Sequence, residues 1–394
     1  MSSLFDPYIP LLEYLAVWLA IFAIAILLRA EKHGIVAKPY YLMLKTGLFN
    51  SWMERLGGRF RRGWLTYFDI GAAMGIGLLI FVIYSFTLNI INLVNKSPQA
   101  GPTLLIIPLP GLTVSWEIFP YILISIAVLL IPHEVAHGIA SAIDKVPLKS
   151  SGVFLAVILP GGFVEIDEQE LAKRKARTKL RVFAAGSFTN VITWFLVVLL
   201  ITNFAVSISP LYDSKPSGVL ITGLVSGGAA QANHIPAWSV LTSVNNTSVL
   251  SVTDLRNLLA PLIPGHHLNL TVSGTNYVIL TQPASNDPSR ATIGIFTFDY
   301  YQPRASFLPV SLPFQYYSTL QWMSLILLGV ALVNMLPMVP FDGDRYFDTV
   351  LSRLGVKNPK TARTIRAVAS LASLALLGGN LVLSYLSFGT IFPR

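Results

Sequence analysis

Two histidines and a glutamate in the run His133-Glu134-Val135-Ala136-His137 form an HExxH motif. On a helix, His133 and His137 lie one turn apart on the same face, so both imidazoles can bind one metal ion. Glu134 lies beside them and can act as a base toward water at that ion. The motif also occurs by chance on soluble helices, so the rest of the chain must distinguish a metalloprotease from a coincidence.

The location of the motif is unusual, because it lies in an apolar run. Residues 118–131 carry no charge, and the run 118–143 is long enough to cross a bilayer. Each ionisable group in such a span costs about 2.5–3.5 kcal/mol on insertion, so these groups are candidates for a functional site.

The composition indicates an integral membrane protein. Of the 394 residues, 53% are hydrophobic and 12% are charged, whereas soluble domains have about 25% charged residues. The chain has no cysteine, which excludes a disulfide framework, cysteine-bound zinc and a thiol nucleophile. A metal ion must therefore bind histidine and carboxylate side chains.

The charge distribution predicts six membrane spans with both termini outside. The apolar runs that we interpret as spans are residues 10–28, 68–94, 118–143, 180–206, 319–339 and 365–388. The connections after the first, third and fifth spans hold 22 of the 28 Lys and Arg residues. Because basic connections remain in the cytoplasm, this pattern predicts that these three connections are cytoplasmic. It also explains the net charge of +9 without a nucleic-acid partner.

A second chemical feature follows the fifth span, where Pro337 and Pro340 interrupt the helix just before Asp342. Broken backbone at membrane depth requires a protein or water-filled surrounding. The third and fifth spans run in the same direction, so Asp342 and the histidines lie toward the same side. Asp342 would complete a three-ligand site with an open fourth position. The alternative is an interfacial Asp-Gly turn, and we interpret Asp344 as a charge that leaves the membrane.

Two other regions have distinct patterns. Residues 151–166 are apolar and contain Pro160-Gly161-Gly162, which predicts a strand pair or re-entrant hairpin with a free edge for an extended peptide, or else an interfacial loop. Residues 207–305 are rich in Ser, Thr, Asn and Gly, with predicted strands at 219–225, 240–244, 268–272 and 277–280 and a helix at 252–259. We expect a small, mostly-β domain outside the membrane.

Four motifs in this order resemble those of the site-2 protease family of intramembrane metalloproteases, peptidase family M50. They are HEVAHG at 133–138, LPGGFVEI at 159–166, AAGSFTN at 184–190 and NMLPMVPFDGDR at 334–345. The resemblance implies zinc held by His133, His137 and Asp342, with Glu134 as general base. It also implies that the substrate is bound at the Gly161-Gly162 hairpin and near Asn190 and Asn334. Residues 217–249 resemble a PDZ domain, but Ala237-Trp238-Ser239 replaces its usual Gly-Asp step.

The resulting fold class is a polytopic α-helical membrane protein with about six transmembrane helices, a re-entrant β hairpin and an inserted extracytoplasmic PDZ-like domain. Its expected parts are a first helix and basic cytoplasmic loop (1–67), a membrane core (68–206), the PDZ-like domain (207–305) and a C-terminal membrane part (306–394). We expect a multi-pass cell-membrane protease with its site toward the cytoplasm, acting on transmembrane substrates in the lipid bilayer. The sequence does not indicate an oligomeric state.

Three alternatives remain open at this stage. A transporter or a substrate-sequestering scaffold also fits a broken helix with buried charges, although a transporter should show repeated halves. A different membrane zinc protease could take its third ligand from Glu165, Glu168 or Glu170. We expect His33, His234, His266 and His267 to be surface residues and not a second metal site.

Overall fold

The chain folds into two compact units, which we describe separately. The computed structural model describes residues 9–157, 159–284 and 287–393. Val198–Gln321 forms unit 2, and the remaining described residues form unit 1.

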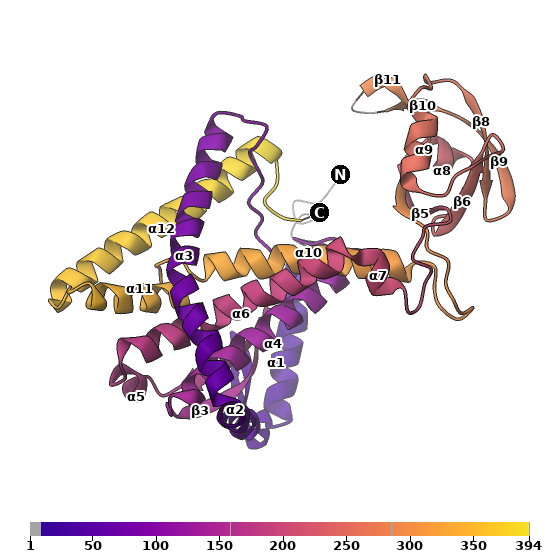
Figure 1. Ribbon diagram of the computed structural model, residues 1–394. Coiled ribbons are helices and arrows are strands. Elements are labelled where there is room, and N and C mark those ends of the chain that lie inside the picture. Colours follow the sequence, from indigo (N-terminus) through magenta and orange to yellow (C-terminus); the bar gives the residue numbers. More distant parts are fainter. Residues whose placement is uncertain (1–8, 158, 285–286, 394) are drawn as a thin grey trace. The chain divides into compact units, whose positions relative to one another are not determined.

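Unit 1 is mainly helical (Figure 1). Its N-terminal elements are α1 (Ile9–Leu27), η2 (Ala30–His33), β1 (Ile35–Lys38), β2 (Tyr41–Thr46), α2 (Leu48–Arg59) and α3 (Arg61–Val94). They are followed by α4 (Phe119–Ile143), β3 (Leu148–Ala156), β4 (Leu159–Ile166), α5 (Glu168–Ala172) and α6 (Ala176–Thr202). The C-terminal elements are α10 (Leu312–Val333), α11 (Asp342–Arg353) and α12 (Pro359–Phe388). Helices α6 and α10 each begin in one unit and end in the other.

Five of the described helices, α3, α4, α6, α10 and α12, are long and apolar enough to cross a membrane. Each overlaps one of the predicted spans. The first predicted span is also helical, as α1, but α1 is not among the helices that are long enough within the described residues, so a sixth span stays a prediction. Helix α10 ends at Val333 and not at residue 339 as predicted, because the proline-containing segment after it cannot continue a helix.

The connection between α1 and α3 is more ordered than the sequence suggested. The sequence predicts a basic cytoplasmic loop here, and this connection contains the β1–β2 hairpin and helix α2. Strand β2 pairs with β3 in a four-stranded antiparallel sheet of order β1-β2-β3-β4. The predicted 151–166 hairpin is therefore present as β3 and β4, and β4 forms an edge of the larger sheet.

The C-terminal half of α4 lies in the core of unit 1. It packs against α2, α3 and α6 in a buried cluster formed by Met53, Phe68, Ala136, Ile139, Ala140, Ile143, Val146, Leu171, Val182 and Ala185. Gly138 allows a close approach of α2, since a Cβ atom there would lie 2.2 Å from the sulfur of Met53. The helix that carries HEVAH is thus held on several sides by packed neighbours.

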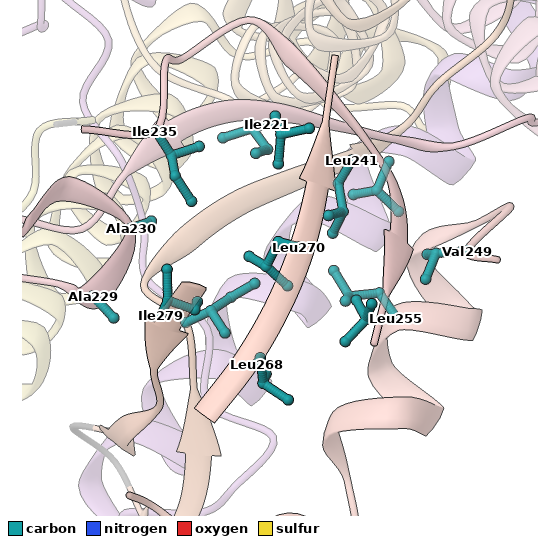
Figure 2. Close-up of a cluster of buried hydrophobic side chains, with 14 residues drawn as sticks. Ile221, Ala229, Ala230, Ile235, Leu241, Val249, Leu255, Leu268, Leu270 and Ile279 are labelled. Atoms are coloured by element: carbon teal, nitrogen blue, oxygen red, sulfur yellow. The ribbon is translucent and has the colours of Figure 1, made fainter. Parts of the chain in front are cut away.

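Unit 2 is a mostly-β domain around its own hydrophobic core (Figure 2). Its helices are α7 (Phe204–Ile208), α8 (Ala229–Ala232) and α9 (Val252–Leu259). Its strands are β5 (Val219–Leu224), β6 (Ser239–Val244), β7 (Thr247–Ser248), β8 (His267–Val272), β9 (Thr275–Leu280), β10 (Gln282–Ala284), β11 (Asp287–Thr292) and β12 (Ile295–Asp299). The main sheet has the order β12-β5-β6-β8-β9. The four predicted strands and the predicted helix are present, while the resemblance to a PDZ domain stays a prediction.

Candidate metal centre

Helix α4 positions the two histidines with their Nε2 atoms facing each other. These atoms are 3.2 Å apart, and both side chains are buried. Gly186 on α6 makes room for this arrangement, because a Cβ atom at this position would lie 2.4 Å from the His133 ring. A side chain larger than hydrogen at position 186 would displace a proposed ligand.

Asp342 follows the interrupted segment in the sequence, and its side chain approaches both histidines. Its Oδ2 atom lies 3.1 Å from Nε2 of His137 and 3.6 Å from Nε2 of His133. The backbone N–H of Gly343 donates to the carbonyl of Asn334 at 2.8 Å. A Cβ atom at position 343 would lie 2.4 Å from the backbone of Met335, so this close return of the chain requires glycine.

The three ligand atoms fit a single tetrahedral ion. Zinc binds histidine nitrogen and carboxylate oxygen at about 2.0–2.2 Å, which places tetrahedral ligand atoms about 3.3 Å apart. The observed separations of 3.1, 3.2 and 3.6 Å lie around this value. In the described part of the chain, His133, His137 and Asp342 form the group of His and acidic side chains that is close enough to hold a metal ion.

A hydrogen bond at Nδ1 of His137 favours metal binding through its Nε2 atom. Nδ1 of His137 lies 2.8 Å from the carbonyl oxygen of Val182, which can only accept a hydrogen bond. Nδ1 therefore donates, and the lone pair of Nε2 faces Asp342 and His133. Sequence reasoning missed this partner, because a backbone carbonyl leaves no residue-type signal.

Asn190 is the corresponding partner of His133. Its Nδ2 atom lies 2.9 Å from Nδ1 of His133, while its buried Oδ1 atom has no hydrogen-bond partner among the described residues. A half-turn of the amide exchanges these two atoms. If Nε2 of His133 binds an ion, Nδ1 carries the proton, and the rotated amide oxygen accepts it. In that orientation the amide oxygen has a partner, and the amide nitrogen takes the position that has none.

Replacing Asn190 tests this role. We expect Asn190→Ala to weaken zinc binding by about 10- to 100-fold, because the outer partner that fixes the imidazole is lost. Competition with a chelator of known affinity measures the change. Ser187→Ala is a matched control, since Ser187 is also buried on α6 and its hydroxyl makes no hydrogen bond within the described residues. Equal zinc affinity in Asn190→Ala and the wild type would contradict the assignment.

Glu134 contacts the β4 strand. Its Oε2 atom accepts a hydrogen bond from the backbone N–H of Val164 at 3.0 Å. A Cβ atom at position 162 would lie 3.2 Å from Cγ of Glu134, so Gly162 leaves space for the carboxylate. Gly161 has another reason to be glycine, because the ring of Phe154 on β3 fills the position of its side chain.

A pocket of about 620 Å³ opens onto the two histidines, Glu134, Asp342 and Asn334. Nδ2 of Asn334 lies 3.3 Å from Nε2 of His133. The remaining wall is rich in charged and polar side chains, namely Lys149, Glu165, Glu168, Gln169 and Arg345. A pocket of this size and polarity can admit water to the site.

The three glutamates considered as alternative ligands have other partners. Glu165 accepts a 2.6 Å hydrogen bond from Ser150 and pairs with Lys45 at 3.2 Å. The bond to Ser150 and the charge of Lys45 lower the pKa of Glu165 below its usual value. Glu168 pairs with Arg345 at 2.6 Å, and Glu170 pairs with Lys173 at 2.7 Å. The structure therefore favours Asp342 as the carboxylate ligand.

Asp344, which we interpret from the sequence as a charge that leaves the membrane, has a partner in the structure. Its side chain is buried and forms a two-point ion pair with Arg366 of α12. The hydroxyl of Tyr346 donates to the carbonyl of Ala72 in α3 at 2.5 Å. Helix α11, which begins with Asp342, is thus fastened to two long helices. The sequence did not indicate this ion pair, because hydropathy does not show which charge will find a partner.

Outside the pocket, Arg181 ties three helices together. It pairs with Asp69 of α3 at 2.7 Å and with Asp144, at the end of α4, at 3.0 Å. Because Arg181 precedes Val182, this network helps to fix the carbonyl that orients His137. The four remaining histidines, His33, His234, His266 and His267, are exposed, as expected.

A membrane-type helical fold, in which an aspartate from a distant helix joins the two histidines of an HExxH helix, defines the class of membrane metalloproteases. Comparison with known proteins supports this class. Residues 121–377 match the family model described as Peptidase family M50. The chain belongs to this family.

Two relatives show how far the likeness extends. The chain is 30% identical over 180 residues to the "Membrane-bound transcription factor site-2 protease homolog" of Arabidopsis thaliana. That match covers 45% of this chain and 34% of the plant protein, so the chain spans about a third of this relative. An uncharacterized protein of Methanocaldococcus jannaschii is 22% identical over 340 residues, or 84% of this chain and 82% of the relative.

Proposed function

We propose that the chain is an intramembrane zinc protease of the site-2 type, which hydrolyses peptide bonds in or near transmembrane segments of membrane-tethered regulatory proteins. The observation that carries the proposal is the convergence of Asp342 on the paired Nε2 atoms of His133 and His137. Membership of peptidase family M50 supports it.

The proposed site has three protein ligands, which is typical of catalytic zinc. When bound, zinc would supply a Lewis acid that polarises a carbonyl oxygen and lowers the pKa of water toward about 7. Glu134 accepts the proton from the attacking water and donates it to the leaving amine. Its hydrogen bond from Val164 engages one carboxylate oxygen and leaves the other for this transfer. Asn334, which lines the same pocket, is placed to donate a hydrogen bond to the substrate carbonyl.

The free edge of β4 is the proposed binding site for an extended substrate. The N–H of Val164 bonds to Glu134 and not to β3, so the backbone groups of Val164 face away from the sheet. Backbone direction alternates along a strand, so those of Gly162 face outward too. A substrate segment that pairs with this edge would lie extended beside Glu134. This matters because a peptide bond in a regular helix is shielded by its own backbone.

Removing one donor from this edge should weaken substrate binding. We expect Gly162→Pro to lower kcat/KM about 3- to 10-fold, the equivalent of one hydrogen bond of roughly 0.5–1.5 kcal/mol. Gly162→Ala is the matched control, because it adds a Cβ atom near Glu134 but keeps the N–H. If both variants cleave a model substrate equally well, edge pairing at Gly162 is excluded.

The proposed orientation follows from the basic connections, which would put the pocket toward the cytoplasm and the PDZ-like domain outside. Lys149 and Arg345 in the pocket wall belong to two of these connections. The PDZ-like domain could then exclude bulky substrates by size.

The proposal is tested with the purified full-length protein and a model substrate that has one membrane span. We expect cleavage inside or beside the apolar segment, loss of cleavage after chelation and recovery with zinc, with product masses that locate the cut. A non-catalytic transporter or scaffold would give intact substrate under all of these conditions.

A further inference from the structure

Helix α2 has three faces of different character. Asn50, Met53 and Gly57 form a buried face. Ser51, Glu54, Arg55 and Gly58 form an exposed polar face, and Leu48, Phe49, Trp52 and Leu56 form an apolar one. In each set the residues follow each other at helical spacings of three or four, except the adjacent pairs Leu48-Phe49 and Glu54-Arg55.

The buried face supports the metal-site helix. Met53 is 1% exposed and packs against Gly138, the residue after His137. A Cβ atom at Gly57 would lie 3.3 Å from the side chain of Ile143 at the end of α4. This face has its partner within the protein.

Leu56, at the end of the apolar face, packs partly against the core of unit 1, but the other three residues of this face are largely exposed. Leu48 is 81% exposed, Phe49 59% and Trp52 45%. Phe60, which follows the helix directly, is 55% exposed. Large aromatic side chains are costly to expose to water, but they are favoured at the boundary of a bilayer.

Charge and chain continuity indicate what covers this face. Helix α2 ends at Arg59, and the long apolar helix α3 begins at Arg61, so the apolar face lies at the start of a candidate membrane span. Arg55, Arg59 and Arg62 are exposed and form no ion pair within the described residues. Arginines beside Trp and Phe on a short amphipathic helix favour a negatively charged lipid surface.

We propose that α2 is an interfacial helix that binds the anionic surface of the bilayer through Leu48, Phe49 and Trp52, with Arg55, Arg59 and Arg62 on the lipid phosphates. Its opposite side packs on α4. The leaflet therefore supports the helix that carries His133 and His137.

Single cysteines can test the proposal cleanly, because the chain contains none. Phe49→Cys and Trp52→Cys report on the apolar face, and Ser51→Cys and Glu54→Cys are matched controls on the polar face of the same helix. Each full-length variant is labelled with an environment-sensitive fluorophore and placed in vesicles of phosphatidylcholine, with or without phosphatidylglycerol. Circular dichroism confirms that each variant keeps its helices.

We expect bromine-labelled acyl chains to quench the labels at 49 and 52, and aqueous acrylamide to quench those at 51 and 54. Phosphatidylglycerol should shift the emission at 52 to the blue, and Arg55→Glu with Arg59→Glu should abolish that shift. Equal aqueous quenching at all four positions would overturn the proposal. Shielding of 49 and 52 from both quenchers would also overturn it, because a protein surface would then cover this face. The readout involves no peptide cleavage, so it stands or fails separately from the proposed activity.

Discussion

Glu134→Gln is expected to lower the cleavage rate by about 10²–10⁴-fold while the protein still binds zinc, because proton transfer by a positioned carboxylate contributes that factor. The amide keeps the shape of the side chain but cannot accept the proton of the attacking water. It can also keep the contact with the N–H of Val164 through its oxygen. Single-turnover cleavage of a one-span substrate, with metal content measured on the same preparation, checks both parts.

Another carboxylate of the same pocket provides the control. Glu165 lines the pocket but is bonded to Ser150 and Lys45, so Glu165→Gln should retain most of the activity. Wild-type cleavage by Glu134→Gln would contradict the assignment of the general base. Loss of activity together with loss of zinc would instead indicate a structural role for Glu134.

Asp342→Ala is expected to release zinc, with a loss of affinity greater than the roughly 10- to 100-fold effect of outer partners. Two imidazoles alone leave an incomplete set of ligands. His137→Ala should behave in the same way, whereas Glu165→Ala should keep its metal. Zinc titration of the purified variants against a chelator measures the differences.

The comparison between these two acidic residues is decisive for the third ligand. If Asp342→Ala retains zinc and Glu165→Ala loses it, the third ligand is Glu165 of β4 and not Asp342. The fold would then have to bring Glu165 away from Lys45 and toward the histidines.

Local patterns in the sequence predicted much of this site. The four-residue spacing of His133 and His137 predicts two ligands on one face, and Pro337 and Pro340 predict the interruption before Asp342. The direction of the spans indicates only that these two segments lie toward the same side of the membrane. Their approach to within 3.1 Å depends on packing between helices about 200 positions apart, and no local pattern encodes it.

Other parts of the fold could not be predicted for different reasons. The β1–β2 hairpin and α2 lie between two apolar runs. This segment has many basic residues, a composition that is also typical of a cytoplasmic loop. Strand β2 becomes recognisable only through its pairing with β3, a long-range contact. Gly186 illustrates a further limit. The motif around it is visible in the sequence, but the sequence does not show that the His133 ring packs against it and so requires a glycine.

The central claim is that His133, His137 and Asp342 bind one zinc ion, and X-ray absorption at the zinc edge tests it most directly. For the wild type we predict a first shell of nitrogen and oxygen at about 2.0–2.2 Å with imidazole scattering, and a changed shell or no zinc in Asp342→Ala. An identical spectrum and zinc content in Asp342→Ala, or a first shell without imidazole, would contradict the claim.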